Sequence, residues 1–245
     1  MRARILRFLL AAITVSASMT RSASAAGVDL AWDDCGVYGT MLKTFSCNSN
    51  VGLPFMLYGS FVPPPDIDQF VGIAAQVDIC TMTSSFVDWW AHGTGYCRGT
   101  NALFTSFDFT AGPFNCADPY LGQAAGGFAY DVSFGDVDRA RMRIQCAVPF
   151  DQRAPVDPNT EYYAFQVRIS RSQSTGDGSC AGCSTPACII LNDIQLFQPP
   201  EAGNDPVLTN PVNDYHVNWQ ATVPNCPFIV SVSNASWGRL KNLYR

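Results

Sequence analysis

Residues 161–198 carry two strand patterns separated by a cysteine-rich stretch, and this arrangement constrains the fold most strongly. In residues 161–170 (EYYAFQVRIS), apolar and polar residues alternate with the period of a half-buried strand. Residues 172–186 are rich in Gly, Ser and Cys, a composition typical of a long connection. Residues 187–198 (ACIILNDIQLFQ) are almost continuously apolar, as in a strand covered on both faces. We therefore expect a central hairpin, cross-linked by disulfides at its turn, around which the rest of the chain packs.

Shorter strand patterns recur along the whole chain. They lie in residues 27–50 (two short strands), 52–62, 70–80, 102–109, 126–134, 138–148, 215–220 and 228–232. The alternation is sharpest in residues 138–148, where every second side chain is expected to face inward: Ala140, Met142, Ile144 and Cys146. Because no strand–helix alternation is visible, we predict an all-β fold, a disulfide-stabilised antiparallel β-sandwich of jelly-roll type.

The composition supports this fold class. Turn-forming residues are abundant, with 19 Gly and 16 Pro. Only two Glu (Glu161 and Glu201) and two Lys (Lys43 and Lys241) are present, and these residue types favour helices. A net charge of −5 argues against nucleic acid as a partner.

The N-terminus has the pattern of a signal peptide, which we place at residues 1–26. A positive segment precedes a short apolar run, and Ala23-Ser24-Ala25 matches an A-x-A cleavage site. The run is too short to span a bilayer, and no later stretch is apolar enough. We expect a secreted or cell-surface protein exported from a bacterium. It would comprise a single sandwich domain (27–235) and a short, partly helical C-terminal tail (236–245). A domain boundary in the Pro-rich residues 199–211 is the alternative.

Ten cysteines in an exported chain predict disulfides. The spacing favours two short loops, closed by Cys35 with Cys47 and by Cys97 with Cys116. Two further cysteines near strand ends can cross-link the sandwich, namely Cys80 and Cys146. The remaining four would form two bonds: Cys180, Cys183, Cys188 and Cys226. The even number leaves no thiol that must be free.

The cysteine-rich stretch also contains sequences that resemble catalytic motifs. Residues 178–182 (GSCAG) fit G-x-nucleophile-x-G, but the strand–turn–helix elbow that this motif needs is not indicated. Cys180 and Cys183 form a C-x-x-C pair without the helix N-terminus that lowers a thiol pKa. A four-cysteine zinc site is disfavoured in an oxidising compartment. We therefore predict no catalytic residue.

An aromatic segment is the candidate ligand site. Trp89, Trp90 and Tyr96, with His92 between them, can form a platform on which sugar rings stack. The alternative is that these rings fill the core, where aromatic side chains bury much area.

Acidic and basic clusters in loops and strands provide further candidates. Structural calcium is possible at Asp136, Asp138 and Asp157, although Asp also makes turns, and no other cofactor is expected. Three arginines share one face of the strand at 138–148: Arg139, Arg141 and Arg143. Such a stripe can bind an acidic glycan or pair with Asp on a neighbouring strand.

Several phrases resemble a group of exported bacterial proteins known mainly from genome sequences. The most specific are C-x-G-C-x-T-P-x-C at 180–188 and W-G-x-x-K-x-L-Y-R at 237–245. The resemblance covers nearly all of the mature chain and implies a secreted bacterial setting, without a catalytic residue. In architecture alone, the strand pattern is also similar to cohesin-type and carbohydrate-binding sandwiches.

Three functions remain open from the sequence. The first is a non-enzymatic sandwich for binding or surface attachment, with carbohydrate as the favoured ligand and another surface protein as the alternative partner. The second is a structural or assembly protein of the envelope or an extracellular layer. The third is a hydrolase with an Asp-based site.

Overall fold

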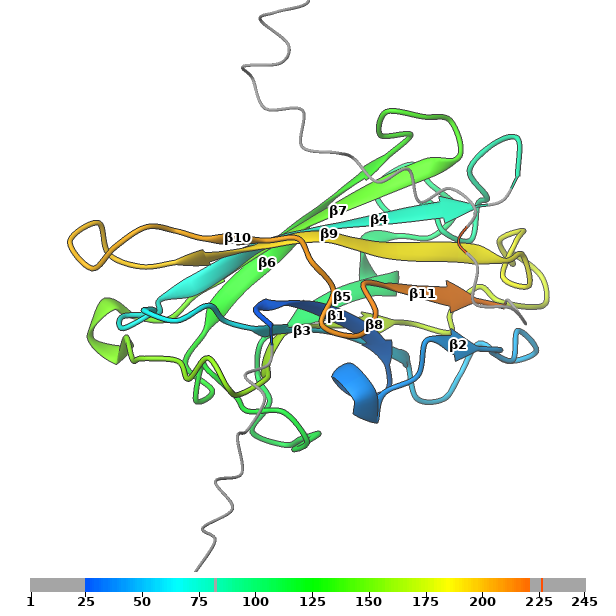
Figure 1. Cartoon of the computed structure of the whole chain (residues 1–245). Helices are drawn as coiled ribbons and strands as arrows, with labels where there is room; N and C mark the ends of the chain where they lie inside the picture. The colour runs from blue at the N-terminus through cyan, green and yellow to red at the C-terminus, as the bar shows by residue number, and fades with distance from the viewer. Residues whose placement is uncertain (1–24, 82, 221–225, 227–245) are drawn as a thin grey trace, which may run out of the picture.

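The computed structural model describes residues 25–81, 83–220 and 226, which form two β-sheets packed against each other (Figure 1). The four-stranded sheet has the order β1 (Gly27–Trp32), β3 (Phe55–Val62), β8 (Tyr162–Ile169) and β5 (Leu103–Ser106). The larger sheet has the order β2 (Leu42–Lys43), β11 (His216–Trp219), β9 (Ala187–Phe197), β4 (Gly72–Thr81), β7 (Arg139–Ala147) and β6 (Ala125–Val132), with β10 (Val207–Leu208) beside β9. The helical turns in the described residues are η1 (Gly36–Tyr38), η2 (Thr100–Ala102) and η3 (Phe150–Gln152).

The strand pairing is nested around one hairpin. The innermost pair, β6 with β7, lies in the larger sheet. The strands before and after it in the sequence, β5 and β8, pair in the smaller sheet. The next pair outward, β4 with β9, lies in the larger sheet again. All of these pairs are antiparallel. Alternation of nested pairs between two sheets is the arrangement of a jelly roll, so the predicted fold class, a disulfide-stabilised all-β sandwich, is confirmed.

The core lies between the sheets and follows the predicted alternation. On β7, Ala140, Met142 and Ile144 are buried, whereas Arg143 and Gln145 are exposed. At one end of the core, Trp219 stacks on Trp89 with ring centroids 4.7 Å apart and on Phe45 at 4.3 Å. These contacts make the aromatic side chains a substantial part of the core.

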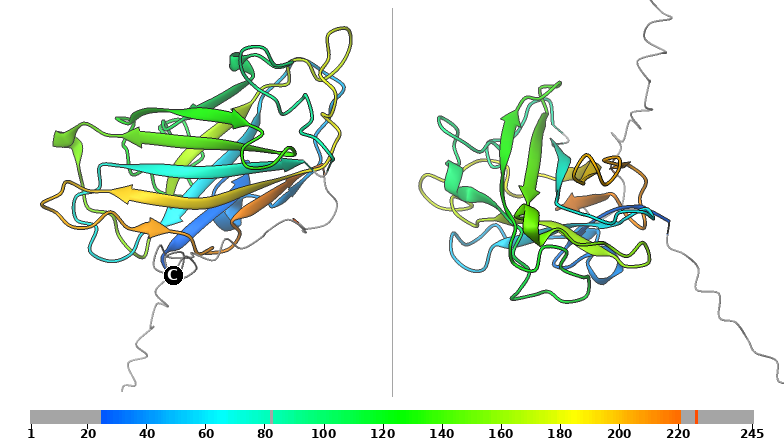
Figure 2. Two further views of the ribbon diagram at one scale, coloured as in Figure 1. Left: turned by 90° about the horizontal axis from the view of Figure 1, so that it is seen from above. Right: turned by 90° about the vertical axis from the view of Figure 1, so that its left-hand side faces the viewer.

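The expected central hairpin is wrong. β8 belongs to the four-stranded sheet, between β3 and β5, and β9 belongs to the larger sheet, between β4 and β11. Residues 170–186 cross from one sheet to the other, as the views in Figure 2 show. β8 is more buried than the half-buried strand predicted, since polar Gln166 is also buried, and β9 is covered on both faces only over residues 187–191. The inward faces of the two strands meet across the core and do not lie side by side.

Four disulfides link the described residues, with a pairing that differs from the expected one. They are Cys35–Cys116, Cys47–Cys183, Cys97–Cys180 and Cys188–Cys226. Cys80 and Cys146 are free thiols, so the prediction that they are bonded is wrong. In the antiparallel ladder of β4 and β7, Cys80 lies opposite Arg139 at one end, and Cys146 lies opposite Ile73 at the other end. The length of the ladder therefore keeps the two thiols apart.

Several expectations concern residues that the structure does not describe: most of the signal peptide, the strand at 228–232 and the C-terminal tail. The Pro-rich residues 199–211 contain β10, which pairs with β9 and so adds to the larger sheet. No helix in the described part of the chain is long and apolar enough to cross a membrane. Four disulfides are consistent with an extracellular protein.

Candidate functional site

The predicted aromatic platform does not exist as an exposed surface. Trp89 and Trp90 are fully buried and His92 is 4% exposed, so of the four predicted residues Tyr96 alone, at 49%, reaches solvent. The Arg98 guanidinium lies 4.1 Å from the Trp89 ring centroid, and the Trp89 ring nitrogen donates to Ser174. The alternative reading, in which these rings fill the core, is the one that the structure supports.

The predicted calcium ligands are not brought together. Asp136 and Asp138 lie in the loop between β6 and β7, whereas Asp157 lies in the loop before β8. Asp157 Oδ1 accepts the backbone N–H of Asn159 at 2.8 Å, and Asp136 Oδ1 accepts that of Val137 at 3.2 Å. These carboxylates therefore act as turn-forming groups, and calcium binding gains no support from their positions.

The arginine stripe on β7 is paired with aspartates of neighbouring strands. Arg141 binds Asp78 of β4 through two hydrogen bonds, from Nε at 2.6 Å and from Nη2 at 2.8 Å. Arg143 pairs with Asp131 of β6. Of the two readings of the stripe, cross-strand pairing is the one observed, which leaves these two guanidinium groups engaged within the sheet.

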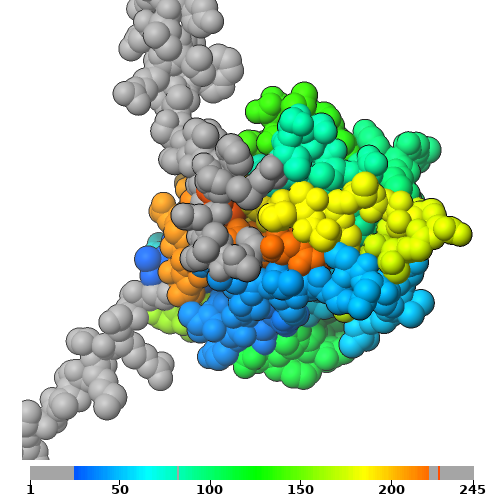
Figure 3. Space-filling view, turned by 90° about the vertical axis from the view of Figure 1, so that its right-hand side faces the viewer, coloured from blue at the N-terminus to red at the C-terminus, as the bar shows by residue number. Residues whose placement is uncertain are grey.

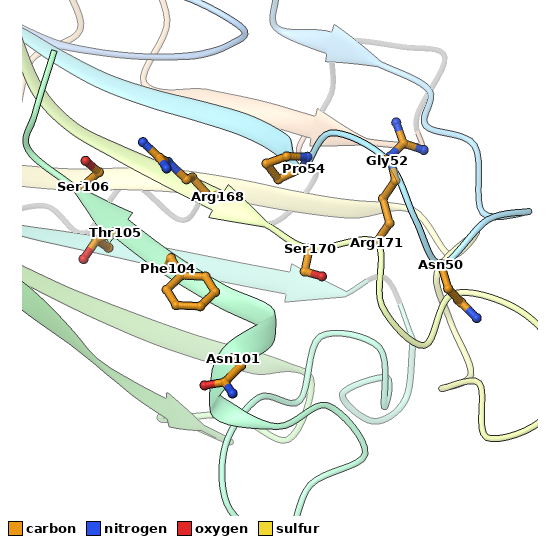
Figure 4. Close-up of a pocket in the computed structure, with 10 residues that line it drawn as sticks. All are labelled: Asn50, Gly52, Pro54, Asn101, Phe104, Thr105, Ser106, Arg168, Ser170 and Arg171. Atoms are coloured by element: carbon orange, nitrogen blue, oxygen red, sulfur yellow. The ribbon is translucent and has the colours of Figure 1, made fainter. Parts of the chain in front are cut away.

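A groove on the outer face of the four-stranded sheet is the best candidate for a ligand site. Its volume is about 520 Å³, and it lies between β5, the end of β8 and the loop before β3 (Figure 4). It is lined by Asn50, Gly52, Pro54, Asn101, Phe104, Thr105, Ser106, Arg168, Ser170 and Arg171. This volume is in the range of small-ligand sites.

Strand register places an aromatic ring beside a cation in this groove. Phe104 on β5 and Met56 on β3 are the direct partners of Arg168 on β8, so the three residues form one row across the sheet. The Leu103 side chain points into the core, and Phe104 therefore points outward, where it is 50% exposed. An exposed ring next to an exposed guanidinium is the main chemical feature of the groove.

A chain of hydrogen bonds orients Arg168. Its Nε donates to Gln166 Oε1 at 2.6 Å, and Gln166 Nε2 donates to the Tyr58 hydroxyl at 2.6 Å. Gln166 and Tyr58 lie opposite each other on β8 and β3. Because Gln166 holds Nε, the terminal nitrogens of Arg168 face the groove in a defined orientation.

The wall of the groove opposite Phe104 is held by the loop of residues 170–186. Asn50 Oδ1 accepts the backbone N–H groups of Ser174 at 2.8 Å and Thr175 at 3.0 Å. Arg171 Nε donates to the Leu53 carbonyl at 2.8 Å. In the space-filling view of Figure 3, the yellow loop lies directly against the blue segment that forms this wall. The wall is thus attached at several points and is preorganised.

The groove is basic although the chain is acidic. Among the described residues that line it, none is acidic, while Arg168 and Arg171 both face it. A second groove of about 550 Å³ shares Pro54 and both arginines with the first. Its one acidic lining residue, Asp33, pairs with Lys43. With a net charge of −5 on the whole chain, this concentration of positive charge favours an anionic ligand.

A second candidate for acid–base chemistry lies outside the groove, where buried Asp29 and partly buried Glu161 lie close together. Glu161 Oε1 accepts the Ser60 hydroxyl at 2.6 Å, and Asp29 Oδ1 accepts the backbone N–H of Asp214 at 2.7 Å. Burial, with Asp29 nearby, raises the pKa of Glu161 to about 7, and burial also raises the pKa of Asp29. Asp29 is 1% exposed, and neither carboxyl lines the groove. The pair is therefore placed for a structural role.

Comparison with known proteins assigns no function to the groove, so its assignment rests on its geometry. No protein-family model and no curated protein matches the chain. Sequence reasoning placed Arg168 on the polar face of its strand and placed Phe104 in a strand, but it connected neither to a site. The missing information was the register between β5 and β8, which a single sequence does not show.

Proposed function

We propose that this is an exported, non-enzymatic sandwich protein that binds carbohydrate in the groove beside Phe104 and Arg168. The observation that supports this most directly is the cross-strand pair itself. The exposed face of Phe104 can pack on the apolar face of a sugar ring, while Asn101 and Ser106 provide polar groups for hydroxyls. A ring, a cation and polar side chains are thus combined within one concave surface.

The favoured ligand is an acidic saccharide. A guanidinium binds a carboxylate through two parallel hydrogen bonds, and two guanidinium groups face the groove. The shared lining of the two grooves at Arg168 and Arg171 supports binding of more than one sugar unit. Export, predicted from the N-terminal sequence and consistent with the four disulfides, would place the protein where such polysaccharides occur.

The test measures binding of oligosaccharides from alginate, a polyuronate, and from amylose, which is neutral. We expect the alginate fragments to bind more tightly. Phe104→Ala and Arg168→Gln should each weaken this binding about tenfold or more, the effect of losing ~1.4 kcal/mol. Matched controls are Phe114→Ala, at a ring that is 78% exposed outside the groove, and Arg153→Gln, at another exposed arginine.

The outcomes separate cleanly. Weaker binding in the two groove variants and unchanged binding in the two controls supports the proposal. Absence of binding to either saccharide by the wild-type chain would refute it, as would unchanged affinity in both groove variants. Circular dichroism of each variant verifies that the sandwich is intact.

A further inference from the structure

A free thiol lies opposite a disulfide on the outer face of the larger sheet. Cys80 on β4 is the direct partner of Cys188 on β9, and Cys188 is bonded to Cys226. The three cysteines, with Ile190, form a small buried cluster separate from the main core, and Tyr215 packs against it. Their exposures are 1%, 2% and 6% for Cys80, Cys188 and Cys226. The disulfide and the thiol are thus enclosed in one buried cluster.

The register makes Cys80 a possible alternative partner for Cys188. Directly opposite residues of antiparallel strands point to the same face and have Cα atoms about 4.5–5.5 Å apart. Disulfides span Cα distances of about 4.4–6.8 Å, a range that includes the 5.6 Å of the existing Cys188–Cys226 bond. A Cys80–Cys188 bond therefore needs no separation or sliding of β4 and β9.

We propose that Cys80, Cys188 and Cys226 form an intramolecular thiol–disulfide exchange site. The Cys80 thiol gives its proton to solvent, and its thiolate attacks Cys188 Sγ. The Cys80–Cys188 bond forms while the Cys188–Cys226 bond breaks, and Cys226 leaves as a thiolate that takes up a proton. One disulfide replaces another, so the exchange consumes no oxidant or reductant.

The leaving sulfur has a hydrogen-bond acceptor beside it. Cys226 Sγ lies 3.1 Å from Oδ1 of Asn218, which itself lies opposite Cys188 on β11. A disulfide sulfur carries no hydrogen, whereas a thiol at Cys226 can donate to this oxygen. The contact is therefore more favourable after the exchange than before it. The product presents a new thiol at Cys226, which can form a mixed disulfide with a small-molecule disulfide from outside.

The surroundings of Cys80 make the exchange slow at neutral pH. Burial raises the pKa of Cys80 to about 11; Arg139 opposes this increase, and Asp78 and Asp138 contribute to it. The other groups of the cluster around Cys80 are the bonded Cys188 and Cys226, the side chain of Ile190 and the ring of Tyr215. At pH 7 about one Cys80 in ten thousand is then a thiolate, and the exchange rate should rise about tenfold per pH unit up to pH 10.

Cys146 provides a matched control within the same chain. It is also a buried free thiol, 5% exposed, and burial raises its pKa to about 12. Its partners in the ladders are Ile73 and Gly126, so no disulfide lies opposite it. Any behaviour of Cys80 that depends only on being a buried thiol should also appear at Cys146.

The experiment traps exchange in the full chain. Wild type, Cys80→Ser, Cys80→Ala and Cys146→Ser are incubated with iodoacetamide at pH 7, 8 and 9, then digested without reduction and mapped by mass spectrometry. In wild type and Cys146→Ser we expect alkylated Cys226 together with a Cys80–Cys188 peptide, accumulating about tenfold faster per pH unit. In the two Cys80 variants, alkylation of Cys226 should be lost.

Two results would overturn the proposal. One is alkylation of Cys80 itself, with Cys188–Cys226 intact, because the Cys80 thiol would then react with the reagent and not with its neighbour. The other is alkylation of Cys226 at the wild-type rate in both Cys80 variants. Mapping of the wild-type chain alone decides between exchange and direct alkylation, so the test holds even if a variant fails to fold.

Discussion

The pair of carboxyl groups formed by Glu161 and Asp29 leads to a prediction about stability and pH. In Glu161→Gln the side chain keeps an oxygen that can accept the Ser60 hydroxyl, and it gains an NH₂ group that can donate to Asp29. The variant therefore imitates the protonated form of Glu161 at every pH. In the wild type, by contrast, this form is lost as the pH rises through the folded-state pKa.

The sign and size of the pH-dependent change in stability follow from the folded-state pKa of Glu161. Burial raises the pKa of Glu161 from 4.5 to about 7, so the folded state holds its proton more tightly than the unfolded chain does. The stabilisation is fully present below pH 4.5 and is lost as the pH rises through 7. At about 1.4 kcal/mol for each pKa unit, the loss amounts to about 3 kcal/mol as an upper bound.

Urea unfolding at pH 5 and pH 8 measures this effect. We expect Glu161→Gln to gain stability relative to wild type between pH 5 and pH 8 by about 1–2 kcal/mol, less than the upper bound because solvent screens the partly exposed carboxyl. Glu201→Gln is the matched control, because Glu201 is the only other glutamate and is exposed. If the stability difference between wild type and Glu161→Gln is the same at both pH values, the pKa of Glu161 is not raised in the folded state as argued.

Two further predictions concern the core and use urea unfolding of the oxidised chain. Gly59→Ala should lower the free energy of unfolding by about 1–3 kcal/mol, because a Cβ there would lie 2.3 Å from the Phe165 ring. Gly127→Ala is the control and should lower it by about 1 kcal/mol or less, because a Cβ there would have nothing within 4 Å. Equal losses in the two variants would contradict this prediction. Trp219→Ala should lower the free energy of unfolding by about 3–5 kcal/mol, because the buried ring of Trp219 stacks on Trp89 and its Nε1 donates to a backbone carbonyl at 2.7 Å. A loss below about 1 kcal/mol would show that the aromatic cluster is not central to stability.

The sequence predicts individual strands well because their burial is a local, periodic property. Every second residue of β7 is buried as expected, and β9 is covered on both faces over residues 187–191. What failed was the relation between strands. Periodicity shows that a strand has an inward face, but it does not show which sheet the strand joins. For this reason, β8 and β9 were expected to pair, although they lie in opposite sheets.

The same limit explains the candidate sites. The spacing of cysteines favoured bonds between near neighbours in sequence, yet the shortest separation observed is 38 residues and the longest is 136. The sequence left both platform and core open for Trp89 and Trp90, and their burial and packing against Trp219 decide for the core. The proposed exchange site cannot be predicted from the sequence because it depends on one register, Cys80 opposite Cys188.

The loop of residues 170–186 connects these findings. Its cysteines suggested thiol chemistry, but both are bonded, Cys180 to Cys97 and Cys183 to Cys47. Each bond attaches the loop to a different segment, and the one through Cys47 attaches it to the wall of the groove. The hydrogen bonds from its backbone to Asn50 act on the same wall. The groove therefore owes its shape to a cysteine-rich connection that contributes structure, while the free thiol for which we propose exchange, Cys80, lies in a strand without any motif around it.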